Sequence, residues 1–203
     1  MAVQFGARLS ATRLHVEGAP ESGLVLHSDA EATLEDVVLS GVRSPATDFT
    51  IGHAIHAEAG ATVTADRLLI EDVDRLGVST TEATAELRDV TIHRVRSACT
   101  REGCTPFGYA VATERGALSL TRFEIHEADT CGAFLFADAG GADVDLRDGV
   151  IASSTIGACV QVPSYDFGRL QADVIYRDNG ANLEATMLPV PEGAATVETE
   201  MLE

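Results

Sequence analysis

A short pattern of apolar and polar positions recurs along this chain. Each copy reads apolar-x-apolar-x-x-apolar-x-apolar-x-x-small or apolar, where x is mostly polar. The six copies begin at Leu9, Ala32, Val63, Ala85, Leu118 and Val144. Alternation of apolar and polar positions is the spacing of a β-strand, whose successive side chains point to opposite faces. One such unit cannot bury its own apolar face, so we expect the copies to stack on one another.

Each copy predicts two short strands separated by a corner, because two consecutive positions in its middle both point outward. A third short strand, which opens with a glycine, precedes each of the five later copies, and one more follows the sixth copy. These glycines are Gly23, Gly52, Gly77, Gly108, Gly132 and Gly157. Three short strands per coil, at a period of 22 to 33 residues, predict an all-β fold, a right-handed parallel β-helix of about six to seven coils. We expect it to span residues 1–182, and the aperiodic acidic segment 183–203 to form a cap or tail.

Stacking in register predicts columns of equivalent residues along the molecule. One column is aliphatic and belongs to the core: Val16, Leu39, Ile70, Ile92, Ile125 and Ile151. A second column, at the corner, alternates in charge: Arg13, Asp36, Arg67, Asp89, Arg122 and Asp148. Opposite charges on neighbouring strands attract and like charges repel, so we interpret the second column as a device that fixes register.

The charge balance excludes several classes of partner. The formal net charge is -18, from 32 acidic and 14 basic residues, all of the latter arginine. Such a surface repels nucleic-acid phosphates and anionic membranes. No apolar run is long enough to cross a bilayer, so no direct membrane insertion is expected. The N-terminus falls almost inside the first copy, from which we expect neighbouring domains in a longer protein.

The strongest candidate for chemistry is a row of outward residues on consecutive coils. Stacking places Glu71, His93 and His126 in this row, and the next column adds Glu127. Imidazoles and carboxylates at strand spacing are suited to a divalent metal or to acid–base catalysis. No other cofactor is expected. A second, weaker cluster combines His53 with a pair, His27 and His56, that we expect to stack in register.

Two long connections, residues 43–51 and 96–107, leave the same corner of the coil and are expected to form one lateral lobe. Asp48, Arg101 and Glu102 are the binding candidates in this lobe. Phe134 and Phe136 are further candidates. If Leu135 points inward, both rings are exposed and form an apolar contact surface for a partner or a sugar ring.

Cysteine spacing favours a disulfide over a metal site. Cys99 and Cys104 lie in the longer connection, and Cys131 occupies the equivalent position one coil later. The pairs Cys99–Cys104, Cys99–Cys131 and Cys104–Cys131 all remain open. Pairing of Cys131 with Cys159 is doubtful, because Cys159 lies far along an outward position of its strand. A disulfide implies an oxidising, extracytoplasmic compartment.

The segment 116–125, GALSLTRFEI, and its five counterparts resemble the right-handed parallel β-helix repeat proteins of the pectate-lyase-like superfamily. The likeness is to uncharacterised secreted or surface repeat modules of GC-rich bacteria. Lyase members of that superfamily use aspartates that bind Ca²⁺ with a lysine or arginine base, and glycosidase members use several aspartates in a groove. This chain has no lysine and no such convergent group, so neither set is carried over.

Two functions follow as expectations. The first is a non-catalytic extracytoplasmic β-helix, a scaffold or a module that binds a carbohydrate or another surface protein within a larger secreted or surface protein. The second is a carbohydrate-active enzyme, lyase or glycosidase-like, that uses the row of Glu71, His93 and His126 or the lateral lobe.

Overall fold

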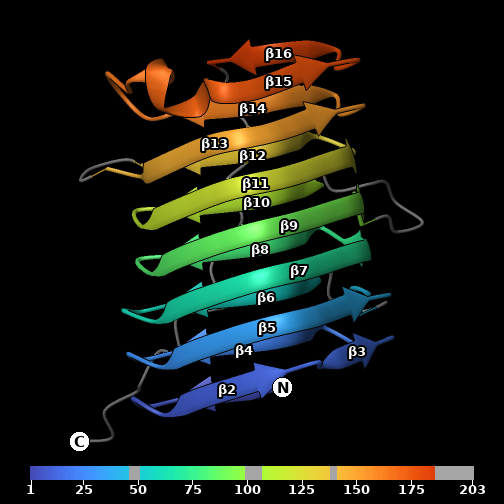
Figure 1. Ribbon diagram of the computed structural model, residues 1–203, viewed down its shortest axis with the longest axis vertical. Helices are drawn as coiled ribbons and strands as arrows, with labels where there is room; N and C mark the ends of the chain where they lie inside the picture. The colour runs from blue at the N-terminus through green and yellow to red at the C-terminus, as the bar shows by residue number, and fades with distance from the viewer. Residues whose placement is uncertain (46–50, 99–106, 138–140, 186–203) are drawn as a thin grey trace, which may run out of the picture.

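The chain alternates between two parallel β-sheets that enclose the core (Figure 1). The computed structural model describes residues 1–45, 51–98, 107–137 and 141–185. Sheet A contains, in spatial order, β1 (Ala2–Gln4), β4 (Ser22–His27), β6 (His53–Glu58), β8 (Leu76–Thr81), β10 (Tyr109–Glu114), β12 (Cys131–Phe136), β14 (Ile156–Gln161) and β16 (Ala181–Glu184). Sheet B contains β2 (Arg8–Thr12), β3 (His15–Glu17), β5 (Glu31–Ser40), β7 (Thr62–Asp74), β9 (Thr84–Arg96), β11 (Ala117–Ala128), β13 (Asp143–Ala152) and β15 (Ala172–Arg177). The predicted all-β class and the parallel pairing are confirmed.

Each repeat contributes two strands, not the three that the pattern predicts. The two alternating stretches of one copy form a single long strand in β5, β7, β9, β11 and β13, and they remain separate only in the first repeat, as β2 and β3. The strand bends without ending, because one residue at the predicted corner takes a left-handed backbone conformation: Asp36 has φ 53° and Arg67 has φ 58°. Hydrogen bonding to the neighbouring strands resumes directly after the bend.

The predicted aliphatic column is confirmed. Leu39 pairs with Ile70, Ile70 with Ile92, and the register continues to Ile125 and Ile151. These side chains are at most 1% exposed. Sheet A closes the core from the other side with residues such as Leu26 and Ile55, which are fully buried. Regular register therefore places equivalent residues of successive repeats next to one another along the whole molecule.

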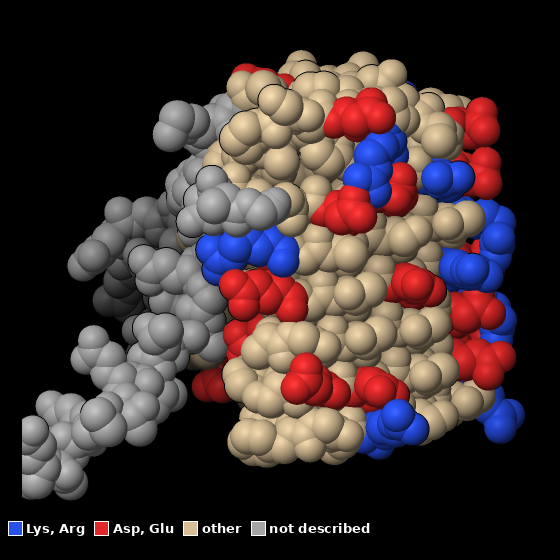
Figure 2. All heavy atoms as spheres, turned by 90° about the vertical axis from the view of Figure 1, so that its left-hand side faces the viewer, with Lys and Arg blue, Asp and Glu red and all other residues tan. Residues whose placement is uncertain are grey.

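The alternating charge column is also present. The Arg67 guanidinium lies 2.5 Å from an Asp36 carboxylate oxygen, and Arg122 lies 2.6 Å from Asp89. Figure 2 shows basic side chains lying among acidic ones, not in separate blocks. The alternation stops near the C-terminal end, where Asp148 and Asp173 occupy successive positions at the bend. Exposed pairs of this kind stabilise little, so the column mainly disfavours shifts in register.

A second apolar cluster lies on the face of sheet A turned away from the core. It consists of Leu76, Tyr109, Ala112, Cys131, Phe134 and Cys159. The Tyr109 and Phe134 rings stack with centroids 4.6 Å apart. Leu135 points into the core as assumed, yet Phe134 is only 2% exposed. The expectation that Phe134 forms an exposed contact surface is therefore wrong, whereas Phe136 is half-buried at the edge of the cluster.

The disulfide in the described part of the chain joins Cys131 and Cys159, with their Cα atoms 6.2 Å apart. This pairing corrects the doubt expressed from the sequence. Both residues lie in the outer cluster of neighbouring strands β12 and β14, so the distance along the strand is short enough to bridge. Because Cys131 is bonded to Cys159, the predicted pairs Cys99–Cys131 and Cys104–Cys131 are wrong. The pair Cys99–Cys104 lies outside the described residues.

A short 3₁₀ helix, η1 (Phe167–Leu170), packs against β13 and β15 near the C-terminal end of the described fold (Figure 1). Leu170 is fully buried, and the Tyr165 hydroxyl donates to the carbonyl oxygen of Val144 over 2.5 Å. Strand β16 crosses the domain boundary expected at residue 182, and residues 186–203 of the expected tail lie outside the described part. Helices of the described segments include none long and apolar enough to cross a membrane.

Candidate functional site

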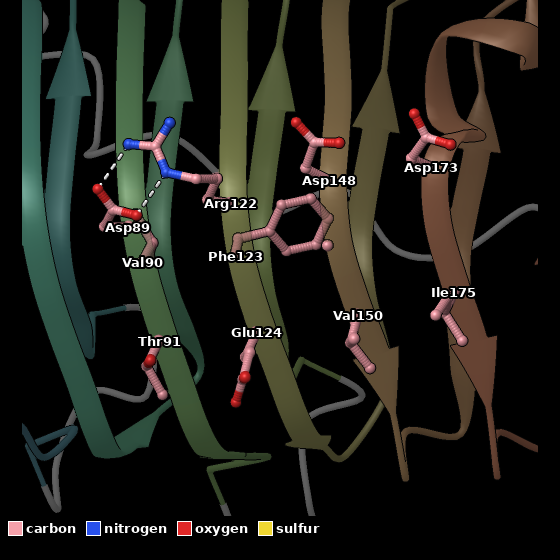
Figure 3. A pocket seen from close by; sticks show the side chains of 11 residues that line it. Asp89, Val90, Thr91, Arg122, Phe123, Glu124, Asp148, Val150, Asp173 and Ile175 are labelled. Atoms are coloured by element: carbon pink, nitrogen blue, oxygen red, sulfur yellow. Dashed lines mark hydrogen bonds and ion pairs between the residues drawn. The ribbon is translucent and has the colours of Figure 1, made fainter.

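A groove of about 540 Å³ runs over the outer face of sheet B near its C-terminal end (Figure 3). Four repeats contribute to it, through strands β9, β11, β13 and β15. The lining residues are Asp89, Val90, Thr91, Arg122, Phe123, Glu124, Asp148, Gly149, Val150, Asp173 and Ile175. The groove exists because each of these strands bends at a left-handed residue, which turns the two limbs of the sheet towards each other.

Gly149 shapes the floor of the groove. The equivalent position carries Val90 and Phe123 in the two preceding repeats. A Cβ atom at residue 149 would lie 2.3 Å from the Phe123 ring, so only glycine leaves room for this ring in its present position. Figure 3 shows the Phe123 ring lying across towards β13. Phe123 itself is 3% exposed, so it supports the floor more than it presents a face to a ligand.

The two ends of the groove differ in electrostatics. At one end, Arg122 holds both carboxylate oxygens of Asp89, at 2.7 and 2.6 Å. The hydrogen bonds from Arg122 lower the pKa of Asp89, and the same contacts raise the pKa of Arg122. This end therefore carries a closed ion pair.

The opposite end carries two acidic groups. Asp148 and Asp173 lie at the same bend position of neighbouring strands, and within the described residues neither has an ion-pair partner. Like charges on adjacent strands repel unless a cation separates them. Beside them, Val150 and the 59% exposed Ile175 form an apolar strip on the other limb of the groove (Figure 3). A cationic group with an apolar flank is the ligand chemistry that fits this end.

Comparison of the chain with protein-family models, with curated proteins and with solved structures gives no match.

The structure brings the predicted histidine row together. Glu71 pairs with His93, and His93 with His126, whose ring centroids lie 6.2 Å apart at nearly a right angle. However, each imidazole has its own carboxylate. His93 Nε2 lies 3.3 Å from Glu127, and His126 Nε2 lies 3.6 Å from Glu124.

An arginine completes this surface network. Arg94 binds both carboxylate oxygens of Asp72 at 2.7 Å, and it lies 2.6 Å from His93 Nδ1 and 3.7 Å from Glu71. Its hydrogen bonds lower the pKa of Asp72 to about 2. Across the described segments, no three His, Cys, Asp or Glu side chains are placed to hold a metal ion. In the structure the row of Glu71, His93 and His126 is thus part of a network of ion pairs.

The bases of the two long connections share an anchor that the sequence analysis missed. The backbone NH of Ser44 donates to Asp74 over 3.1 Å, and that of Ser97 donates to Asp129 over 2.7 Å. Asp74 directly follows the third copy of the pattern, and Asp129 directly follows the fifth. Each aspartate therefore lies in the repeat that comes after the connection it anchors. The binding candidates Asp48, Arg101 and Glu102 lie outside the described residues.

The groove was also missed, because outward positions at a strand corner resemble ordinary solvated surface. Two signals point to it in retrospect. Position 149 is glycine where the other copies have a larger apolar residue, and the charge column ends in two acidic residues instead of alternating.

Proposed function

We propose that this chain is a non-catalytic, extracytoplasmic right-handed parallel β-helix module, and that it binds a protein partner through the groove on sheet B. In-register pairing between successive repeats in both sheets supports the β-helix. The Cys131–Cys159 disulfide supports an oxidising compartment, since such bonds persist mainly outside the cytoplasm. The module then presents its groove as part of a larger secreted or surface protein.

One observation carries the choice of ligand. The acidic pair Asp148 and Asp173 lies beside an apolar strip that includes the exposed Ile175. An extended peptide segment with an arginine or lysine next to an aliphatic side chain matches both features. A sugar ring fits less well, because carbohydrate recognition relies on exposed aromatic faces and Phe123 is 3% exposed.

The charges favour binding over catalysis. Glycoside cleavage needs a carboxyl group that stays protonated near neutral pH, which requires a raised pKa. Five carboxyl groups of the described residues have a pKa that arginine or histidine partners lower: Asp36, Glu58, Asp72, Asp89 and Asp145. Groups of this kind remain ionised and hold partners in place.

The test uses a fluorescent peptide of alternating arginine and leucine and measures its anisotropy against the protein. Asp148→Asn combined with Asp173→Asn is expected to weaken binding by up to about thirtyfold, since each exposed ion pair contributes up to about 1 kcal/mol. Glu17→Gln combined with Glu21→Gln removes the same charge from exposed positions in the first repeats and is the matched control. Equal loss in both double variants, or no binding by the wild type, would contradict the proposal.

A further inference from the structure

Two histidines are buried on the outer face of sheet A, apart from the groove. His53 is 6% and His56 is 5% exposed, and their ring centroids lie 4.9 Å apart. Both belong to β6, and their strand neighbours are Leu76 and Ser79 of β8. Among the described residues, neither His53 Nε2 nor His56 Nδ1 has a hydrogen-bond partner. The cluster had been expected from His27, His53 and His56, but its geometry differs from the expectation.

The expected register of His27 with His56 is wrong. His56 lies opposite Val25, and the register of β4 with β6 places His27 opposite Glu58. Glu58 therefore lies between the two imidazoles. Its carboxylate is 3.3 Å from His56 Nε2 and 3.6 Å from His27 Nε2, within ion-pair range. The contact with His56 lowers the pKa of Glu58. Glu58 thus places a carboxylate beside both His27 and His56.

Within the described part of the chain, no carboxylate lies in ion-pair range of His53. The described titratable and charged groups around it are His56, the 2% exposed Arg75 and Tyr109, which lies two strands further along the same column. Burial first, then the neighbouring His56 and Arg75, lower the pKa of His53 well below its usual 6.5. Burial raises the pKa of Tyr109 to about 12, so this phenol supplies no negative charge. At neutral pH His53 is therefore neutral in the folded protein.

The position of His53 links it to both long connections. Residue 53 is where the chain rejoins sheet A after the first connection, and the Ser44 hydroxyl closes that connection by donating to the carbonyl oxygen of Ile51 over 2.5 Å. The Arg75 guanidinium lies 4.3 Å above the ring of Phe107, where the second connection returns. Residues 51–53 and Phe107, where the two connections rejoin sheet A, are called the return points here. The same small cluster thus includes or contacts the return points of both connections.

We propose that His53 is an acid-sensitive contact that holds the return points of both connections against sheet A at neutral pH and loosens them on acidification. A proton on His53 places a second positive charge beside Arg75 in a buried cluster, and opening of the cluster relieves it. Full stability of this region is present above the unfolded pKa of histidine, about 6.5, and is lost as the pH falls below it, because the open state then binds the proton more tightly.

Hydrogen exchange read by mass spectrometry tests this in the intact chain, with rates corrected for the intrinsic pH dependence. Protection in β6 and at residues 107–109 is expected to fall by up to about tenfold per pH unit below 6.5, while protection in β13 stays constant. His53→Gln should remove this slope. His93→Gln, at a histidine whose side chain is 33% exposed, should leave it intact.

Three results would overturn the proposal. One is an unchanged slope in His53→Gln, and another is a uniform loss across all strands, which indicates global acid unfolding. The third result comes from NMR titration of His53 in the wild-type protein, which needs no variant that folds. His53 should become protonated well below pH 6.5, and a pKa at or above 6.5 contradicts the account.

Discussion

At the bend of each long strand of sheet B, one residue takes a left-handed backbone conformation although it is not glycine. Asp89 has φ 52°, Arg122 has φ 54° and Asp148 has φ 52°. This conformation costs an L-residue roughly 1–2 kcal/mol, and it persists here because hydrogen bonds to the neighbouring strands resume on both sides of the bend. The bend in turn aims these charged side chains along one wall of the groove. Local strain and the shape of the site therefore have the same origin.

Gly149→Ala tests how the floor of the groove is packed. The new Cβ would lie 2.3 Å from the Phe123 ring, so the ring must move within a close-packed core. We expect a loss of about 1–3 kcal/mol in the free energy of unfolding, measured by urea denaturation. Val150→Ala, at the half-exposed neighbouring position, is the control and should cost less. A Gly149→Ala protein as stable as the wild type would show that the ring is not confined.

For single residues, the sequence indicates which side chains face outward, because the alternation of inward and outward side chains depends only on the strand period. It therefore predicts the charge column and the row of Glu71, His93 and His126 correctly. It does not show that Arg94 and Glu127 both contact His93 of that row. Such contacts depend on rotamers of neighbouring strands, which no linear pattern specifies.

Strands β12 and β14 are tied together twice, by parallel pairing and by the disulfide. The bridge closes a segment of 28 residues, which includes the whole of β13. Such a crosslink restricts the unfolded chain more than the folded one. The outer cluster around Tyr109 and Phe134 packs against this bridge. The bridge and the cluster therefore stabilise the same repeats that form the groove.

Removal of the bridge by Cys131→Ala with Cys159→Ala is expected to lower the free energy of unfolding by about 2–4 kcal/mol. Thermal and urea unfolding monitored by circular dichroism provide the measurement. Wild-type protein unfolded with and without a reductant is the matched comparison, since reduction should reproduce most of the loss. If the variant and the wild type unfold at the same denaturant concentration, the bridge contributes nothing to stability.

The sequence does not predict the number of strands in each repeat. Two outward residues in a row indicate a corner correctly, but the pattern cannot distinguish a corner that ends a strand from a bend within one. A residue in the left-handed conformation makes the corner a bend within one strand. Residue preference does not predict this conformation for arginine, yet Arg67 and Arg122 adopt it. The cysteine pairing failed for a related reason, because distance along a strand was judged without the outer cluster that brings both sulfurs together.

Across the whole molecule, stacking converts one short pattern into long parallel columns. Sheet B presents the groove and the ion pairs, whereas sheet A buries His53 and His56 on its outer face. The two proposals therefore concern opposite sides of the molecule and are testable separately. Stacking is predictable from the sequence because six copies share one register. The groove lies where this pattern changes, at Gly149 within the sixth copy and at Asp173 after it.

The central claim is that equivalent positions of successive repeats lie on adjacent strands of one sheet. Electron paramagnetic resonance between two spin labels tests it, with labels on introduced unnatural residues so that the native cysteines stay intact. Ser10, Thr33, Thr64, Glu86 and Ser119 form one outward column. Labels at residues 10 and 119 lie four strand spacings apart, so we predict a backbone separation of about 19 Å. Moving the second label to residue 86 should shorten it by about 5 Å. Distances that do not decrease by one strand spacing would contradict the stacked arrangement.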